Sequence, residues 1–535
     1  MTETTALGAP GPTWAELEPE PTDVPQARAM LERAEWAARA FRALDKEAVD
    51  GILEAVVAAA VQHAGEYAER AVAETGFGVV DHKRIKNEAC SRGVLDYYRD
   101  ADFVTPRVDE QARIVEVPRP AGVVLALTPS TNPVATVYFK VLLCLMTRNS
   151  VVVSPHPMAK TVCADAARML AAAAEAAGAP AGVVQVVTEP SIPLIDALMT
   201  DARTSVIVAT GGNAVVRAAY RSGNPALGVG PGNVPVLVDA TADLRAAAQR
   251  IIDSKSFDNS TLCTNESVVI VEESVGDAFV RALRSASAYV LDEAETVRVV
   301  DVVFPQGRFT PAVVGRSAVW LAEQAGLTVP RNTKVLVAEF EQVVPEEVLA
   351  HEKLCPLLGL VRVPSPAAGI KAARAVLRIA GAGHSAAVHS TDPATVLSFG
   401  AECNVLRVSV NVGNSLGSSG IETHLPPTMT IGTGYAGRSS VGENLRPDHL
   451  VNWVRLAHNA DQKVPMGDFS GLSPWRSVTG PVPPYPVPSN AVDAPRVPAG
   501  PRAPRPAAGD DDLREELRRI IIEELHDLIG GGRNG

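Results

Sequence analysis

From about residue 112, the chain alternates short β-branched runs with Ala-rich stretches of helical periodicity, and this alternation is the feature that most constrains its fold. One such Ala-rich stretch is AKTVCADAARMLAAAAEAAG. Strand and helix alternation of this kind is typical of parallel βαβ units. The runs expected to form the first set of strands are ARIVEV, GVVLALT, SVVVSP, GVVQVVT and TSVIVAT.

A second α/β set follows the first, so two α/β domains are expected. Ala-rich helices are predicted around residues 242–254 and 275–290. Residues 24 to about 100 have apolar side chains at spacings of three and four, which predicts several packed helices ahead of the first sheet. The strand order within each sheet stays open. The runs expected to form the second set of strands are VPVLVDA, ESVVIVEES, TKVLVAEF and LGLVRVPS.

Charge and cysteine usage exclude several classes of partner. The 535 residues carry a net charge of −12 with no basic patch, which argues against nucleic acid and anionic membranes. No apolar run of about 18 residues and no basic, apolar leader is present, so we expect a cytoplasmic protein with no membrane partner. The six cysteines form no CxxC pair and no zinc-like cluster, which predicts reduced thiols and no metal.

Both ends of the sequence differ in composition from the middle. Residues 1–23 are rich in Pro, Thr and Glu and are expected to be a disordered leader. Residues 463–509 are dense in Pro, Gly and Ser, which predicts an extended linker. Residues 510–530 place Leu and Ile on one stripe at helical spacing, which predicts an amphipathic helix that docks on another protein or associates with itself.

Glycine-rich segments give one useful signal and two weak ones. The GxGxxG match at Gly432, Gly434 and Gly437 lacks a preceding apolar strand and a following helix, so we interpret it as a decoy. GVGPGN (228–233) favours a turn or a close backbone approach. In contrast, ATGG (209–212) follows an apolar run and precedes a helix, where free backbone N–H groups suit a phosphate.

Seven segments follow one another along the chain: TPSTNPVATVYFK, TRNSVVVSPHP, ATGGNAVVRAAY, GVGPGNVPV, SKSFDNSTLCTNES, HEKLCPLLGL and GAGHS. They occur in the order found in coenzyme A-acylating aldehyde dehydrogenases, and residues 25–460 resemble that family. The likeness extends to the aldehyde dehydrogenase half of bifunctional aldehyde-alcohol dehydrogenases and to the propionaldehyde and acetaldehyde dehydrogenases of bacterial microcompartments.

The resemblance implies an α/β, aldehyde dehydrogenase-like fold with a Rossmann-type cofactor domain, an α/β catalytic domain and a small oligomerisation element. The implied boundaries are a cofactor-binding domain at 24–238 with an oligomerisation hairpin near 112–125, a catalytic domain at 239–424, and a segment at 425–462 that returns to the cofactor and oligomerisation region.

The resemblance also assigns the reacting groups. Cys263 would attack the aldehyde as a thiolate, and Asn132 would donate to the developing oxyanion. Without the family, Cys263 could be a small buried hydrophobe and Asn132 a turn residue before Pro133. Glu352 would hold the nicotinamide ribose, or else is an ordinary surface carboxylate. The other implied cofactor-binding residues are Ser154, Pro155, His156, Pro157, Thr210, Gly211 and Gly212.

Hydrolytic relatives carry a Glu that activates water, and here Val229 stands at about that position. A thiol needs less activation by a general base than water does, so the resemblance implies coenzyme A as the acyl acceptor. His384 in GAGHS is a candidate for the coenzyme A side or for proton transfer, and equally for a structural role. The alternatives are a hydrolytic dehydrogenase that releases a free acid and a non-catalytic assembly protein of the same fold.

The expected substrate is a short-chain aldehyde of the acetaldehyde or propionaldehyde class. The resemblance favours NAD, while NADP stays open because no carboxylate in SPHPM stands ready for ribose hydroxyls. It also implies a homodimer or homotetramer. Residues 510–530 resemble an encapsulation peptide, which predicts a microcompartment shell or cargo partner and a location inside a bacterial microcompartment.

Overall fold

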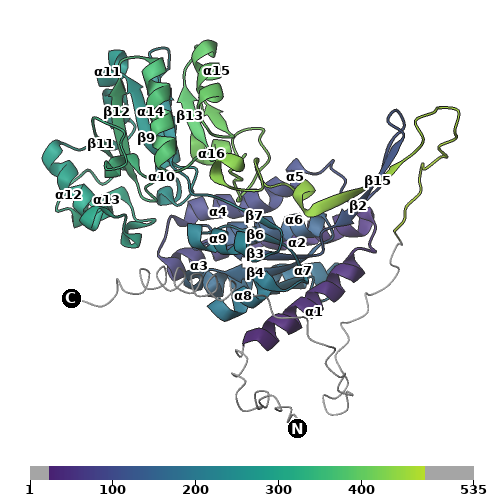
Figure 1. Ribbon diagram of the computed structural model, residues 1–535. Coiled ribbons are helices and arrows are strands. Elements are labelled where there is room, and N and C mark those ends of the chain that lie inside the picture. The colour runs from purple at the N-terminus through teal and green to yellow at the C-terminus, as the bar shows by residue number, and fades with distance from the viewer. Residues whose placement is uncertain (1–22, 476–535) are drawn as a thin grey trace, which may run out of the picture.

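The computed structural model describes residues 23–475, which form two α/β units and a projecting antiparallel arm (Figure 1). The expected α/β class is confirmed, because the two large sheets are parallel throughout. The predicted leader up to residue 22, the linker from residue 476 and the predicted helix at 510–530 lie outside the described residues. No helix within residues 23–475 combines the length and apolar character needed to cross a membrane.

The first unit is built on a five-stranded parallel sheet of order β5-β4-β3-β6-β7. The chain moves outward from β3 to β5 and then returns to the other side of β3 to form β6 and β7. The switch in direction therefore lies between β3 and β6, and ligands of such sheets bind at the carboxyl ends of the strands there. The strands are β3 (Val123–Thr128), β4 (Ser150–Pro155), β5 (Val184–Val186), β6 (Thr204–Ala209) and β7 (Ala226–Gly228).

Helices cover both faces of this sheet, as β-branched strands buried on both sides require. One face carries α1 (Asp23–Phe41), α8 (Ile192–Thr200) and α9 (Asn213–Arg221). The other carries α2 (Lys46–Gln62), α6 (Pro133–Met146) and α7 (Lys160–Ala176), with α3 (Ala64–Thr75), α4 (Val80–Glu88), a π-helical turn (Ala89–Gly93) and α5 (Val94–Tyr97) beside them.

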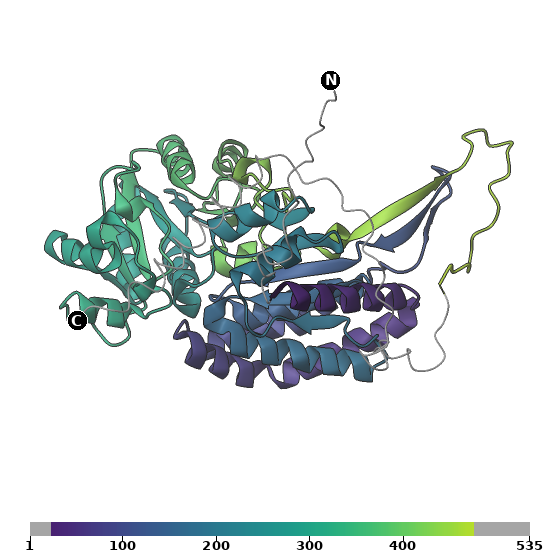
Figure 2. The same ribbon diagram turned by 60° about the horizontal axis from the view of Figure 1, so that its bottom comes forward.

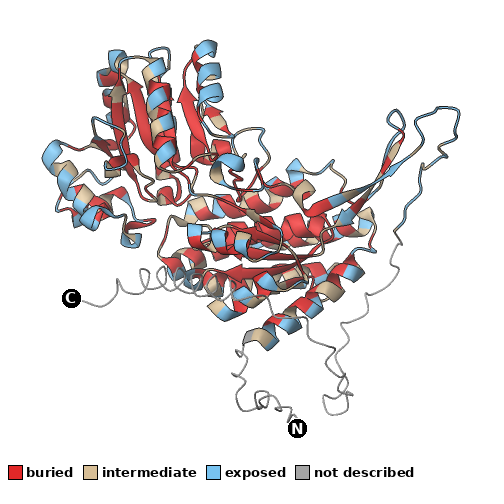
Figure 3. Ribbon diagram, in the orientation of Figure 1, coloured by how far each residue is buried: buried red, intermediate tan, exposed pale blue. Residues whose placement is uncertain are grey.

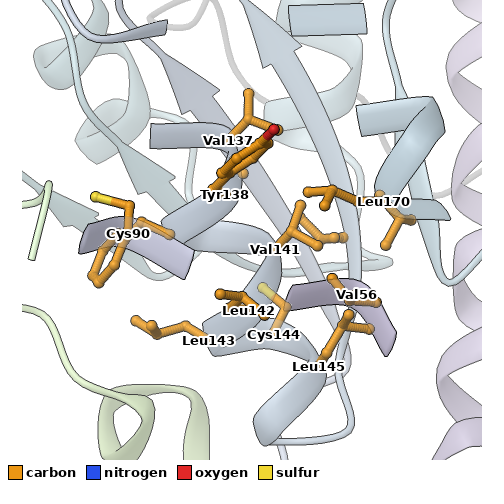
Figure 4. Close-up of a cluster of buried hydrophobic side chains, with 14 of the residues drawn as sticks. Val56, Cys90, Val137, Tyr138, Val141, Leu142, Leu143, Cys144, Leu145 and Leu170 are labelled. Carbon is orange, nitrogen blue, oxygen red and sulfur yellow. The ribbon is translucent and has the colours of Figure 1, made fainter. Parts of the chain in front are cut away.

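Helix α6 is buried along its whole length and forms the centre of this core. Figure 4 shows Tyr138, Val141 and Leu142 of α6 among side chains from α2 and α7, such as Val56 and Leu170. The apolar run VATVYF therefore fixes the start of α6, and with it the position of the residue just before the helix.

The second unit is a seven-stranded parallel sheet of order β10-β11-β12-β9-β8-β13-β14, whose central strands are buried (Figure 3). Its strands are β8 (Val234–Val238), β9 (Glu266–Glu272), β10 (Ala288–Val290), β11 (Val335–Glu339), β12 (Leu357–Val363), β13 (Ala386–His389) and β14 (Val408–Val410). Its helices are α10 (Leu244–Ser256), α11 (Glu273–Ser285), α12 (Glu293–Val303), α13 (Ala318–Gln324), α14 (Pro366–Ile379), α15 (Pro393–Glu402) and α16 (Asn414–Ser418).

A three-stranded antiparallel sheet projects from the first unit as an arm (Figure 2). The run ARIVEV forms β2 (Ile114–Pro120) in this arm and not a strand of the parallel sheet. Its partners are β1 (Arg107–Asp109) and β15 (Val451–Ala457). The hairpin therefore spans β1 and β2, slightly ahead of the expected range 112–125, and the third strand comes from the returning segment.

Candidate active site

A cavity of about 560 Å³ lies where the carboxyl ends of β3, β4 and β6 face the loop that precedes β9. It contains every predicted site residue except His384, together with Val229. The predicted residues that line it are Asn132, Ser154, Pro155, His156, Pro157, Thr210, Gly211, Gly212, Cys263 and Glu352. Residues from five separate segments therefore meet around one enclosed space, which we call the site cavity.

Cys263 borders the site cavity and is half-buried, whereas the other five cysteines, all among the described residues, are fully buried. Enclosure by the protein, followed by the negative charge of Glu352, raises the pKa of Cys263 to about 12. The positive charge of Arg407 opposes this shift. Burial therefore favours the neutral thiol, and a positive charge brought beside the sulfur would favour the thiolate nucleophile.

The loop before Cys263 has an unusual backbone. In the short helical turn η4 (Phe257–Ser260), Asp258, Asn259 and Ser260 have φ values of 51°, 51° and 66°. Three consecutive residues in the left-handed region are costly unless the surroundings hold them in place. Gly78 makes room for this loop: a Cβ there would lie 2.1 Å from Asp258 Oδ1.

Asp258 is the buried anchor of that loop. The Nζ of Lys83 lies 3.0 Å from Asp258 Oδ2, and Lys86 Nζ donates to the same oxygen. Thr261 Oγ1 also donates to Oδ2, at 2.6 Å. Burial alone would raise the pKa of Asp258, but the two ammonium groups and these hydrogen bonds hold it below the usual value. We call Lys83, Lys86, Asp258 and Thr261 the Asp258 cluster.

Asn132 stands at the N-cap position of α6, and its side chain points toward the Cys263 loop. Its Nδ2 lies 3.2 Å from the carbonyl oxygen of Thr261, two residues before Cys263. Its Oδ1 lies 2.5 Å from Lys86 Nζ. The buried helix α6 thus places the Asn132 amide beside the cysteine loop. The sequence indicated this placement only through the family resemblance.

The cofactor side of the site cavity offers groups that suit a nucleotide. Thr210, Gly211 and Gly212 form the turn between β6 and α9, and the N-cap residue Gly212 makes no side-chain cap. A Cβ on Gly211 would meet nothing nearer than Val215 at 3.8 Å, so the turn is open. Ser154 Oγ is buried and has no hydrogen-bond partner among the described residues. Free helix N–H groups and an unsatisfied hydroxyl fit the phosphates and hydroxyls of a dinucleotide.

Glu352 follows the turn η7 (Val348–Ala350) and lies beside the cysteine. Burial raises the pKa of Glu352 to about 8, while the positive charge of Lys255 and the Gly232 N–H oppose the shift. A Cβ on Gly232 would lie 2.1 Å from the Cys263 carbonyl oxygen and 3.2 Å from Glu352 Oε1. GVGPGN therefore makes a close backbone approach, as expected, and Glu352 is not a surface carboxylate.

His384 does not line the site cavity. It is buried behind the cysteine loop, where Nδ1 lies 3.0 Å from Ser385 Oγ and Nε2 has no partner among the described residues. Burial, reinforced by the charge of Arg407, lowers the pKa of His384 to about 3. An indirect hydrogen-bonded route leads from His384 toward the cysteine: Ser385 Oγ contacts the ring, and Asn414 Nδ2 bridges Ser385 Oγ and the Thr264 carbonyl oxygen.

Sequence reasoning did not identify Lys83, Lys86 or Asp258 as parts of the site. Lys86 is 46 residues from Asn132 and 172 from Asp258 along the chain, so no local motif connects them. The one available signal was Asp258 itself, a carboxylate five residues before Cys263 in a segment already singled out.

Comparison with known proteins gives a consistent picture. Residues 17–306 match the model described as "Aldehyde dehydrogenase family". The bifunctional aldehyde-alcohol dehydrogenase of Escherichia coli is 37% identical over 82% of this chain, which spans only 50% of that protein. The chain likewise spans about half the length of the other aldehyde-alcohol dehydrogenases it matches. The acetylating succinate-semialdehyde dehydrogenase of Clostridium kluyveri is 34% identical over 82% of this chain and 96% of its own length.

Solved structures show the same relationship. An acetylating aldehyde dehydrogenase from Geobacillus thermoglucosidasius has a TM-score of 0.81 and 36% identity, covering 82% of this chain and 98% of its own. A propionaldehyde dehydrogenase from Rhodopseudomonas palustris, solved with coenzyme A and an acylated cysteine, has a TM-score of 0.74 and 27% identity, covering 81% of this chain and 97% of its own.

Proposed function

This chain belongs to the aldehyde dehydrogenase family, and from that premise we propose that it oxidises a short-chain aldehyde to an acyl-coenzyme A, with NAD as the hydride acceptor and Cys263 as the nucleophile. The observation that carries the proposal is the meeting of Cys263, Asn132 and the Thr210–Gly212 turn in one cavity. Acetaldehyde and propionaldehyde are the proposed substrate class.

The first step forms a bond between the sulfur of Cys263 and the aldehyde carbon. The carbonyl electron pair moves to oxygen, and the resulting oxyanion is stabilised by N–H donors, for which Asn132 Nδ2 and the Cys263 backbone N–H are the proposed groups. Losing one such donor typically costs about 3 kcal/mol of transition-state stabilisation. Before this step the thiol must lose its proton, which a positive charge brought beside the sulfur would favour.

A nicotinamide held in the site cavity would supply a hydride acceptor. When the hydride leaves the substrate carbon, the carbonyl re-forms as a thioester on Cys263. We propose that Glu352 holds the nicotinamide ribose, and that Ser154 to Pro157 and Thr210 to Gly212 hold the adenosine and phosphate parts. NAD is proposed on the basis of the family alone, and NADP stays open because Ser154 and His156 stand at the end of β4 without a carboxylate for the ribose hydroxyls.

The acyl group then passes to a second nucleophile. Val229 is 6% exposed and lines the site cavity at about the position where hydrolytic relatives carry their Glu. This replacement supports coenzyme A over water: the coenzyme A sulfur adds to the thioester, and Cys263 leaves as a thiolate. His384 is proposed to shape the site from behind, since a pKa near 3 makes it a poor proton acceptor.

NADH formation from acetaldehyde and propionaldehyde, measured with and without coenzyme A, tests this proposal. We expect at most one NADH per active site without coenzyme A, and sustained turnover to acyl-coenzyme A with it. Fast NADH formation that is unchanged by coenzyme A would instead support the hydrolytic alternative. A Cys263→Ala variant controls for background, and unaltered turnover in that variant would revive the non-catalytic alternative.

We also propose that the arm of β1, β2 and β15 joins copies of the chain into a dimer or tetramer. Val108, Val454 and Leu456 on this arm are about 42–43% exposed, which is unusual for apolar side chains on one small sheet. Light scattering of the purified protein tests this, and a monomer at micromolar concentration would contradict it.

The sequence of residues 510–530 supports a further proposal, that this segment carries the enzyme into a bacterial microcompartment. A propionaldehyde dehydrogenase from the Clostridium phytofermentans fucose utilisation microcompartment is 27% identical, with a TM-score of 0.74. The test is a fusion of residues 510–535 to a fluorescent protein in cells that make the shell, with the fluorescent protein alone as control. Diffuse fluorescence of the fusion would count against targeting.

A further inference from the structure

The amide of Asn132 lies between two groups of opposite hydrogen-bonding character. On one side is the ammonium group of Lys86, which can only donate, 2.5 Å from Oδ1. On the other is the carbonyl oxygen of Thr261, which can only accept, 3.2 Å from Nδ2. Rotating the amide by 180° would set a donor against a donor and an acceptor against an acceptor. The two neighbours therefore permit a single orientation of the amide.

We propose that Lys86 is a positioning residue that holds the Asn132 amide with its N–H groups toward the cysteine loop. This inference rests on the proposed function, in which Asn132 donates to the oxyanion. Lys86 is only 1% exposed and contacts Oδ1, whereas the Thr261 carbonyl oxygen contacts Nδ2, so Lys86 acts on the reacting atoms through the Asn132 amide. The 3.2 Å contact from Nδ2 to the Thr261 carbonyl oxygen is long for a hydrogen bond. The amide can therefore give up this contact at little cost and donate its hydrogen bond to a nearby oxyanion instead.

Lys86 is itself held in place by the rest of the Asp258 cluster. Its ammonium group donates to Asp258 Oδ2 as well as to Asn132 Oδ1. Lys83 contacts the same carboxylate oxygen and also donates to the backbone oxygen of Thr131, at 3.0 Å. Lys83 therefore holds the backbone before Asn132, whereas Lys86 holds the Asn132 side chain itself.

Charge adds a second effect to this geometry. Two ammonium groups share one carboxylate, so their positive charge exceeds its negative charge beside the proposed oxyanion site. A cation at Oδ1 polarises the amide and strengthens its N–H donors. In water such an effect would be small, but in a buried site fixed charges act over short distances with less screening.

A double-mutant cycle tests the inference, with Lys83 supplying the matched control. Both lysines pair with Asp258 and both are buried, but only Lys86 contacts the side chain of Asn132. Lys86→Gln and Lys83→Gln are each made alone and in the Asn132→Ala background. The single-turnover rate of NADH formation, the KM for aldehyde and the melting temperature are measured for all of them.

We expect Asn132→Ala to slow NADH formation by about 100-fold or more. Lys86→Gln should slow it by about tenfold with little change in KM, and by less than about twofold in the Asn132→Ala background. Lys83→Gln should lower the melting temperature as much as Lys86→Gln does, yet slow the reaction far less. Its small effect should be the same in both backgrounds.

Equal slowing by Lys86→Gln in the two backgrounds would overturn the inference, as would equal slowing by the two lysine variants. Lys86→Met is made in parallel, so that a folding failure of one substitution leaves the other to decide. A wild-type protein that forms no NADH from any aldehyde would instead overturn the proposed function, and the two failures are therefore distinct.

Discussion

Replacing Gly232 by alanine should disable the site through a single methyl group. Gly232 does not occupy the left-handed region, so alanine can adopt its backbone conformation and the effect is steric. The new Cβ would lie 2.1 Å from the Cys263 carbonyl oxygen and 3.1 Å from the carbonyl carbon. Both contacts are with backbone atoms, which cannot rotate away as the end of a side chain can.

Because non-bonded carbon and oxygen atoms seldom approach within about 3.2 Å, the cysteine loop must move by about 1 Å. A displacement of about 1 Å between reacting groups can cost about 100-fold in rate. We therefore expect Gly232→Ala to slow single-turnover NADH formation by about 100-fold, while overpacking lowers the free energy of unfolding by only about 1–3 kcal/mol.

Stopped-flow NADH formation and urea denaturation measure these two quantities on the same samples. Gly230→Ala in the same segment is the comparison, because its Cβ would meet the side-chain oxygen of Thr433 at 3.2 Å and that hydroxyl can rotate. It should lose much less activity. A Gly232→Ala rate within about threefold of wild type, equivalent to about 0.7 kcal/mol of barrier, would refute the reasoning.

Three further predictions concern Gly78, Glu352 and Glu266. Gly78→Ala places a Cβ 2.1 Å from Asp258 Oδ1 at a φ of +82°, so by urea denaturation it should cost about 2 kcal/mol or more. Gly178→Ala, with a φ of +103° and open space around it, should cost only about 1 kcal/mol, and equal losses would contradict the clash. Glu352→Gln should lower the pKa of Cys263 from about 12, because it removes a nearby carboxylate. Since the pKa of Glu352 is about 8, iodoacetamide should inactivate this variant faster than wild type at about pH 9 but equally fast at about pH 6.5, and no difference at the higher pH would contradict the charge effect. Burial raises the pKa of Glu266 from 4.5 to about 7, so the folded state holds this proton more tightly and the free energy of unfolding should fall as pH rises through that window. Glu266→Gln should flatten this dependence in denaturation curves recorded at several pH values, and an unchanged slope would show that other groups cause it.

The sequence predicted the parallel sheets because their strands are buried on both faces and are therefore continuous β-branched runs, such as the one that forms β9. Strands that lack this signature were missed. β15 is largely exposed, and its sequence VNWVRLA is interrupted by Asn452 and Arg455, so it lacks a continuous β-branched run. β14 has only three residues. ARIVEV was assigned to the parallel set although its partly alternating pattern suits a sheet with one exposed face, and it lies in the arm.

The site was predictable where its residues sit in motifs at strand ends, as Ser154 and Thr210 do. It was not predictable where the decisive contact joins distant helices, as with Lys86 and Asn132, because a single sequence carries no record of such contacts. For His384 the motif left open a role on the coenzyme A side, in proton transfer or in the structure, because its position behind the cysteine loop depends on packing that the segment GAGHS does not encode.

The Asp258 cluster also determines where this protein can be recombined with its relatives. Asp258 belongs to the unit of the second sheet, whereas Lys83 and Lys86 lie on α4, which packs with α3 and α6 of the first. A chimera joined between β7 and β8 would take the carboxylate from one parent and both ammonium groups from the other. Because an unmatched buried charge costs about 3–5 kcal/mol, a shuffled library should inherit α4 and residues 257–261 from the same parent, although 168 residues separate Glu88 from Phe257.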